Sequence, residues 1–141
     1  MNAADKMNRL IISYKISSEI FSFNTMIESC RSFLFSLGYT EISSIYIVLR
    51  ELVFNTIIHS VKNSDGAEFE CSLQYMGKDN FKIVMQNNEG LSKNECFGWI
   101  SRDSDNSNLD RGNMLLNRIA DSIDLDTENN SVTVFVTLIK I

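Results

Sequence analysis

The sequence predicts an α+β fold, a two-layer α/β sandwich whose mixed, mostly antiparallel sheet carries helices on one face. Two observations support this prediction. Long apolar stretches without internal Gly or Pro indicate helices, whereas shorter stretches that alternate between apolar and polar residues indicate strands. Their order is strand, two helices, hairpin, long loop, helix and two strands, which suits one helical layer on a sheet. The 141 residues fit a polar leader over residues 1–8 and a single domain over residues 9–141.

The first half of the chain is expected to contain one strand and two helices. Residues 9–16 alternate enough to form the first strand. Ser17 and Ser18 are N-cap candidates for a helix that Gly38 stops. Thr40 is then expected to cap the second helix.

The second half is expected to contain a hairpin, a long loop and a final helix with two strands. Its segments are, in chain order, a strand at 69–75, a hairpin loop at 77–80, a returning strand at 81–86, a long polar stretch at 87–110, a helix at 112–121, a turn at 129–130 and a last strand at 132–141. Loops longer than about 15 residues without their own structure are usually functional or disordered, so the polar stretch is a candidate for either.

Composition argues against several classes of protein. The net charge of -5, a pI near 4.8 and the lack of a Lys/Arg cluster disfavour direct binding to nucleic acid. No signal pattern or transmembrane stretch occurs, so no membrane association is expected. Cys30, Cys71 and Cys96 are far apart and form no C-x-x-C pair. They indicate reduced thiols in a cytoplasmic protein, where they fill the core rather than form a redox or zinc site.

A polar stripe crosses the second predicted helix. Glu51, Asn55 and His59 are spaced four residues apart within the apolar run 42–61, so they share one helical face. A carboxylate at this place suits a general base, and the Asn55 amide offers a hard oxygen that Mg²⁺ accepts. The alternative is a helix that exposes one polar face. His59 is the only histidine, and a capping role at the helix end is favoured over catalysis.

The sequence motif of this stripe resembles the N-box of the GHKL ATPase superfamily, and most closely that of its small branch of anti-sigma-factor serine kinases. Members carry Glu-x-x-x-Asn-x-x-x-His on the second helix, often with Asn-x-Ile-Ile-His as its core, and residues 51–59 match this pattern. The likeness extends over residues 9–139. It implies the Bergerat ATP-binding fold, ATP and Mg²⁺ as cofactors, Glu51 as catalytic base and Asn55 as metal ligand.

The same resemblance assigns an adenine site after the hairpin. The family's Asp-x-Gly-x-Gly corresponds to a sequence in which Asn88 replaces Asp, Gly90 is kept and Ser92 replaces the second glycine. The Asn88 carbonyl oxygen can accept the hydrogen bond of the adenine amino group, more weakly than a carboxylate. Asn87 takes this role if the alignment with the family motif is shifted by one residue. An ordinary polar turn after a strand is the alternative.

The resemblance also assigns phosphate contacts at the start of the third helix and the last strand. A Gly-x-Gly motif in the family corresponds to Asp110 followed by Arg111 and Gly112, whose backbone N–H groups would face phosphates. Arg111 is expected to pair with phosphate or with a neighbouring carboxylate. For Gly112, a phosphate-binding role and a purely structural role are both kept as alternatives. A Gly-Thr pair corresponds to Asn130 and Ser131, where Asn tolerates a left-handed backbone and Ser keeps the hydroxyl.

The long loop corresponds to the ATP lid, residues 91–110. Phe97 and Trp99 lie within it, and they are expected to anchor it on the core rather than stack on a base.

Three functions follow from these observations. The first is an ATP-dependent serine kinase of a bacterial partner switch. The family resemblance implies that such a protein holds a sigma factor or other regulator and phosphorylates a serine on a small antagonist protein. The second is a non-catalytic binding module on the same fold, since three glycine-motif positions depart from the family pattern. The third, a detached ATPase domain of a sensor histidine kinase, ranks last. An exposed strip on the helix at 20–37 leaves room for homodimerisation or partner binding.

Overall fold

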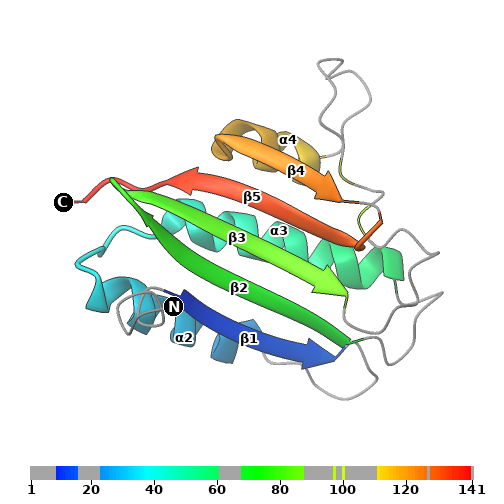
Figure 1. The fold of residues 1–141 in the computed structure, drawn as a ribbon, viewed down its shortest axis with the longest axis horizontal. Helices are drawn as coiled ribbons and strands as arrows, with labels where there is room; N and C mark the ends of the chain where they lie inside the picture. Colours follow the sequence, from blue (N-terminus) through cyan, green and yellow to red (C-terminus); the bar gives the residue numbers. More distant parts are fainter. Residues whose placement is uncertain are drawn as a thin grey trace.

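A computed structural model describes residues 9–15, 23–60, 68–87, 97, 100, 111–126 and 128–140, with the backbone alone for residues 12–15, 57–60, 68, 111 and 112. Five strands form one sheet, and helices cover one of its faces (Figure 1). The strands are β1 (Arg9–Lys15), β2 (Glu68–Gly77), β3 (Asn80–Asn87), β4 (Ser122–Asp126) and β5 (Ser131–Thr137). The helices are α2 (Phe23–Ser36), α3 (Ser43–Ser60) and α4 (Arg111–Ile119).

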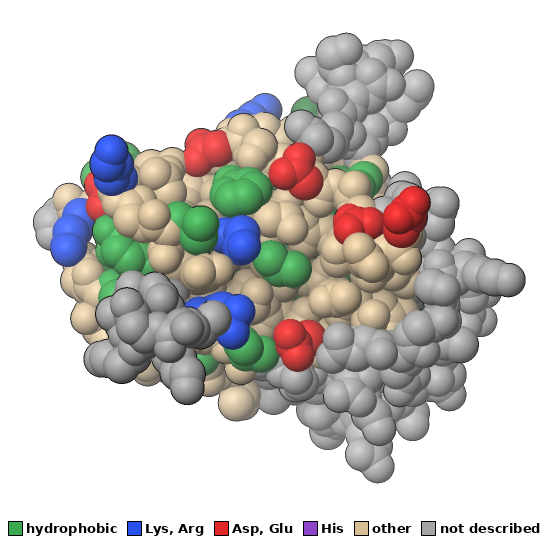
Figure 2. Space-filling view, in the orientation of Figure 1, with side chains coloured by type: hydrophobic (Ala, Val, Ile, Leu, Met, Phe, Trp, Pro, Cys, Tyr) green, Lys and Arg blue, Asp and Glu red, His purple; other side chains and the backbone are tan. Residues whose placement is uncertain are grey.

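The sheet has the order β1-β2-β3-β5-β4. All four described pairings are antiparallel, so the predicted α+β sandwich is confirmed without the parallel component that a mixed sheet implies. Along β3, buried side chains alternate with partly exposed ones, as expected for a sheet with one covered face. Figure 2 views the open face, where apolar, acidic and basic side chains of the described residues lie in small separate groups.

Helix α2 ends in a left-handed turn at Gly38, as the sequence predicted. The Tyr39 N–H donates to the Leu34 carbonyl at 3.0 Å, and the Gly38 N–H donates to the Phe35 carbonyl at 2.9 Å. These two hydrogen bonds define a Schellman motif, which requires a residue at positive φ, and Gly38 has φ 93°. Tyr39 and Leu34 are both buried, so the turn also directs the chain into the core.

Helix α3 begins later than Thr40, which was expected to cap it. The helix starts at Ser43, and the Glu41 carboxylate accepts hydrogen bonds from the Ser43 N–H at 2.9 Å and from the Ser43 hydroxyl. These hydrogen bonds hold the pKa of Glu41 below its ordinary value. The Thr40 prediction was wrong because the helix begins three residues later, at Ser43, whose N–H donates to Glu41 instead.

The hairpin between β2 and β3 turns through Lys78 and Asp79. Both have positive φ, 53° and 66°, the pattern of a type I′ turn, whose twist matches that of the flanking strands. The Tyr39 hydroxyl donates to the Asp79 carboxylate, and the Leu138 N–H donates to the Asp79 carbonyl at 2.9 Å. Three segments distant in sequence are therefore joined at the hairpin.

The core lies between the sheet and the helices. Helix α3 contributes its largest share, because Ile45, Val48, Leu49, Leu52 and Val53 are wholly buried. In Figure 1, α3 lies between α2 and α4 and crosses the sheet. None of the described helices is both long and apolar enough to cross a membrane.

Replacing Gly38 with Ala is expected to lower the free energy of unfolding by about 1–2 kcal/mol, because a residue with a Cβ disfavours the left-handed conformation. The new Cβ would also lie 2.7 Å from Lys140 Cε, which the flexible lysine can relieve by moving. Gly77→Ala separates the backbone cost from the Lys140 contact, since Gly77 also has a left-handed φ of 89° but no heavy atom within 4 Å of the added Cβ. This variant should therefore lose a similar free energy of unfolding. Urea unfolding measures the free energy of unfolding of both variants and of the parent protein. An unchanged value in Gly38→Ala would contradict the left-handed helix end assigned to Gly38.

Candidate functional site

Glu51 and Asn55 share one face of α3, as their spacing predicted, and they are hydrogen-bonded to each other. The Asn55 Nδ2 atom donates to the Glu51 carbonyl oxygen at 2.8 Å and to the Glu51 Oε2 atom at 2.8 Å. Because both bonds use the amide nitrogen, the Asn55 Oδ1 atom is directed away from Glu51. Among the described residues, no hydrogen bond to this oxygen occurs. The third member of the predicted stripe, His59, has a side chain outside the described residues.

A third side chain, Arg50, completes the surroundings of the Glu51 carboxylate. The Arg50 Nη2 atom lies 3.0 Å from Glu51 Oε1, so each carboxylate oxygen accepts one hydrogen bond. The Glu51 side chain is only 16% exposed, whereas that of Arg50 is 39% exposed. A charge so shielded from water requires such donors, and hydrogen bonds to an ionised group are stronger than neutral ones.

The pair lies on the flank of α3 that is turned toward α4. The opposite flank packs against α2, where the Phe23 ring lies 6.0 Å from the Tyr46 ring and 5.0 Å from the Phe54 ring, measured between centroids. Successive helical residues are rotated by about 100°, so Asn55 points half a turn away from Tyr46. Helix α4 also contacts α3, and Figure 1 shows α3 between α2 and α4, so the flank away from α2 is the one turned toward α4. Glu51 lies within about 40° of Asn55 around the helix.

The end of β3 lies beneath this part of α3. The buried Thr56 hydroxyl is 3.8 Å from the Met85 sulfur, and Met85 is two residues before the strand ends at Asn87. Asn87 is itself buried, and its N–H donates to the Asn130 carbonyl at 3.1 Å. The predicted adenine contacts Asn88 and Gly90 lie outside the described residues. The alternative adenine contact, Asn87, is the last residue of β3.

The start of β5 lies beside the end of β3. Asn130 is buried with φ 51°, which confirms that asparagine adopts the left-handed backbone expected at this position. Ser131 is half-buried and pairs with Gln86 of β3 and Asp126 of β4. The structure thus places Ser131 at the same sheet edge as Asn87.

The N-terminal turn of α4 reaches the same side of the molecule. The helix runs from Arg111 to Ile119, so it begins one residue before the start and ends two residues before the end of the predicted range 112–121. Beyond the backbone, the surroundings of Arg111 and Gly112 are not described. The next residue, Asn113, is buried, and its carbonyl accepts a hydrogen bond from Asn117 Nδ2 at 2.8 Å. Figure 1 shows the start of α4, the end of β3, the start of β5 and the end of α3 toward the right of the view. An N-terminal helical turn offers free N–H groups to anions.

Most of the predicted lid, residues 91–110, lies outside the described residues, but two of its side chains are placed. Phe97 and Ile100 are both buried, and the Phe97 ring packs edge-on against Phe69 of β2 with centroids 6.1 Å apart. The Ile100 N–H donates to the Phe97 carbonyl at 3.0 Å. Phe97 is therefore a core anchor, as expected, and Trp99 is not among the described residues.

The metal-binding capacity of the site depends on Asn55. Within the described ranges, no group of three or more His, Cys, Asp or Glu side chains is arranged to hold a metal ion. A nucleotide-bound Mg²⁺ needs only one or two protein ligands, since phosphates and water supply the others. The Asn55 Oδ1 atom fits that requirement.

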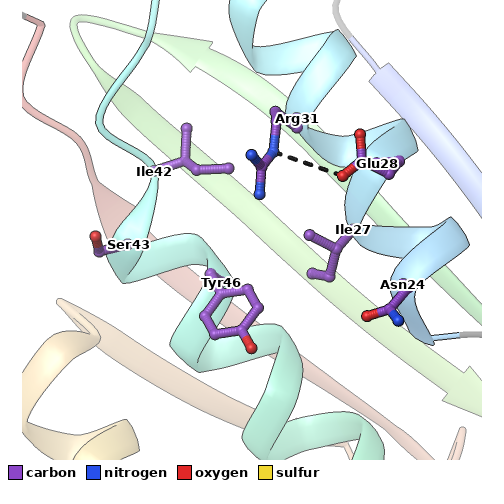
Figure 3. A pocket seen from close by; sticks show the side chains of 7 residues that line it. All are labelled: Asn24, Ile27, Glu28, Arg31, Ile42, Ser43 and Tyr46. Carbon is purple, nitrogen blue, oxygen red and sulfur yellow. Dashed lines mark ion pairs between the residues drawn. The ribbon is translucent and has the colours of Figure 1, made fainter.

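A separate cavity of about 400 Å³ lies between α2 and the start of α3 (Figure 3). It is lined by Asn24, Ile27, Glu28, Arg31, Ile42, Ser43 and Tyr46. Sequence reasoning missed this cavity, because it depends on how α2 and α3 pack. It also missed the contact of Arg50 with Glu51, because consecutive helical residues point in different directions.

Comparisons with known proteins supply no family for this chain: no protein-family model matches it, and a search of curated proteins found no match. The resemblance to GHKL kinases therefore depends on the motif residues alone.

The thiols of Cys30 and Cys71 are expected to be unreactive in the folded protein. Both are buried and free, and burial raises the pKa of the Cys30 thiol to about 12 and that of Cys71 further. At pH 8 only roughly one Cys30 thiol in 10⁴ is then a thiolate, the reactive form. In a Cys96→Ser variant, a disulfide-exchange reagent should label two thiols in urea and almost none without it. Rapid labelling of the native protein would contradict the burial of these side chains.

Proposed function

We propose that this protein is an ATP-binding regulator similar to anti-sigma-factor serine kinases, and that it phosphorylates a serine on a small antagonist protein. The observation that carries the proposal is the Glu51–Asn55 hydrogen bond on the flank of α3 turned toward α4. It places a carboxylate beside an amide oxygen that accepts no hydrogen bond from the described residues, on the helix that α4 contacts. Base, metal ligand and anion site are what phosphoryl transfer requires.

Asn55 would hold the metal. Its Nδ2 atom is engaged by Glu51, so the side chain cannot rotate freely and its Oδ1 atom remains available as a hard oxygen ligand. Bound Mg·ATP would supply the phosphoryl group and the charge that offsets the phosphates.

Glu51 would act as the base. Its two oxygens carry about four lone-pair sites, and the bonds from Asn55 and Arg50 use two of them. In the transfer, Glu51 accepts the proton of the substrate serine hydroxyl while the serine oxygen bonds to the γ-phosphorus. The bond from that phosphorus to the bridging oxygen breaks, and its electron pair leaves with ADP.

The remaining nucleotide contacts come from the neighbouring elements. Asn88 and Gly90 would receive the adenine, Arg111 and the Gly112 turn would face the phosphates, and Ser131 would offer its hydroxyl from the start of β5. Two observations support this arrangement: α4 begins at Arg111, and Ser131 lies in register with the end of β3. A helix N-terminus stabilises negative charge close to it.

The partners follow from the same resemblance. A bacterial sigma factor or other regulator would be held by the protein, and the small antagonist would be its substrate, without direct contact to nucleic acid or membrane. The net charge of -5 agrees with protein partners rather than nucleic acid. We propose a cytoplasmic location for the complex, with a homodimer as its candidate assembly.

Asn55→Ala is expected to abolish Mg²⁺-dependent ATP affinity, because it removes the metal ligand. Glu51→Gln is expected to keep that affinity and reduce turnover by about 10²–10⁴-fold, because glutamine can accept the Asn55 hydrogen bond but is no base. Calorimetry with Mg·ATP and a rate assay separate these effects.

Asn24→Ala is the matched control, since Asn24 lies on α2 beside the separate cavity. It should alter neither quantity. Equal loss of binding in Glu51→Gln and Asn55→Ala would mean that the pair is structural.

The second candidate is a binding module that acts by protein contacts alone, and the departures at Asn88, Ser92 and Asp110 favour it. Replacing a charged acceptor with Asn88 and losing two glycines costs about 1–3 kcal/mol, or roughly one to two decades in affinity. Weak ATP binding is therefore expected, and Asn88→Asp should tighten it, for adenine more than for guanine nucleotides. If millimolar Mg·ATP gives no heat with either protein, the binding module replaces the kinase.

A further inference from the structure

A chain of contacts joins the outer surface of α2 and α3 to the Glu51 carboxylate. We propose that Arg50 is a positioning residue for Glu51 and that Tyr46 in turn positions Arg50. The inference rests on the proposed function, because it concerns the base of that same site. It assigns a role to two residues that the nucleotide motifs do not include.

The first contact fixes the carboxylate. Arg50 Nη2 lies 3.0 Å from Glu51 Oε1, and Asn55 Nδ2 lies 2.8 Å from Glu51 Oε2. Two donors on two different oxygens determine the plane of the carboxylate, whereas either donor alone leaves it free to rotate. The remaining lone pairs then keep a constant direction, which a general base requires.

The second contact fixes Arg50. Its guanidinium carbon lies 5.8 Å from the centroid of the Tyr46 ring, within the range of a cation–π interaction. Tyr46 is held in turn by the edge-on Phe23 ring, whose centroid is 6.0 Å away. An exposed arginine would otherwise sample many rotamers, and a planar guanidinium stacks well on an aromatic face. The ring therefore limits the positions from which Arg50 reaches Glu51.

The third feature connects the contacts of Tyr46, Arg50 and Glu51 to the surface of the protein. Tyr46 lines the cavity between α2 and α3, together with Ile27 and Ile42 (Figure 3). Tyr46 is 36% exposed. A change at the outer flank thus reaches the shielded Glu51 carboxylate through two contacts.

An ordinary surface ion pair is the competing interpretation for Arg50. Exposed pairs contribute little to stability, but the Glu51 side chain is only 16% exposed, so solvent screens it less. The proposal therefore predicts an effect on turnover and on carboxylate orientation, with little effect on folding.

The test uses Arg50→Met, Arg50→Lys and Tyr46→Leu, with Arg31→Met as matched control. Arg31 lines the same cavity and is 47% exposed, but its described ion pair is with Glu28 on its own helix. Three quantities are measured on proteins with a normal unfolding transition. They are Mg·ATP affinity by calorimetry, the kcat and KM of ADP release from Mg·ATP, and the side-chain amide NMR signals of Asn55 without nucleotide.

Arg50→Met is expected to lower kcat about tenfold with unchanged Mg·ATP affinity, because a small displacement of a catalytic group is costly. Tyr46→Leu should lower kcat by less, and Arg50→Lys should restore part of the loss. The Asn55 amide signals should shift in Arg50→Met and Tyr46→Leu, since Asn55 donates to the same carboxylate, and not in Arg31→Met.

The outcomes separate this inference from the proposed function. Absence of Mg·ATP binding in the parent overturns the proposed function and with it the catalytic consequence for Arg50, while the Asn55 signals still decide the positioning. Normal turnover and unshifted Asn55 signals in Arg50→Met overturn the inference and leave the kinase in place. Equal effects of Arg31→Met and Arg50→Met also overturn it, because the loss of any nearby positive charge would then explain them.

Discussion

The packing of α3 on the sheet is the constraint on which the rest of the structure depends. Five wholly buried aliphatic side chains of this helix face the strands, and full burial of each contributes about 1.5–3 kcal/mol. A single exposed hydrogen bond or ion pair contributes about 1 kcal/mol or less, so the apolar face decides the rotation of the helix. With that rotation fixed, Glu51 and Asn55 must lie on the flank toward α4, and Tyr46 and Phe54 on the flank toward α2. The candidate site is thus a consequence of core packing.

The Glu51–Asn55 hydrogen bond links two roles that the motif treats as separate. Asn55 holds one carboxylate oxygen of Glu51, the proposed base, and that carboxylate in turn holds the amide nitrogen of Asn55. Removing the glutamate acceptor would also release Asn55, the proposed metal ligand. A glutamine, which keeps an acceptor oxygen, therefore separates the two proposed roles better than an alanine. Reciprocal support of this kind makes the effects of single substitutions non-additive.

Sequence periodicity was sufficient for the fold class, the order of the elements and the turn at Gly38, because these follow from local patterns. It was also sufficient for the pairing of Glu51 with Asn55, since residues four apart on a helix are neighbours. The contact of Arg50 with Glu51 was not foreseen, because consecutive helical residues point in different directions and only a long side chain can bridge them. The burial of Asn87 and Asn130 depends on which strands become neighbours, which no local pattern contains. The sites at Asn88 and Gly90, by contrast, stay predictions.

The missing glycines are weaker evidence against a nucleotide site than their number suggests. A glycine in a family motif usually supplies a left-handed backbone or room for a ligand to approach. This chain supplies left-handed backbone without glycine at Lys78, Asp79 and Asn130, and the proposed resemblance aligns Asn130 with a glycine of the GHKL motif. Asparagine is among the residues that tolerate this conformation best, and its cost there is about 1–2 kcal/mol at most. The left-handed backbone that a motif glycine supplies can therefore be kept after the glycine is replaced by asparagine. What a side chain cannot replace is close approach, so the decisive departures are those where phosphate or adenine would touch the backbone, at Ser92 and Asp110.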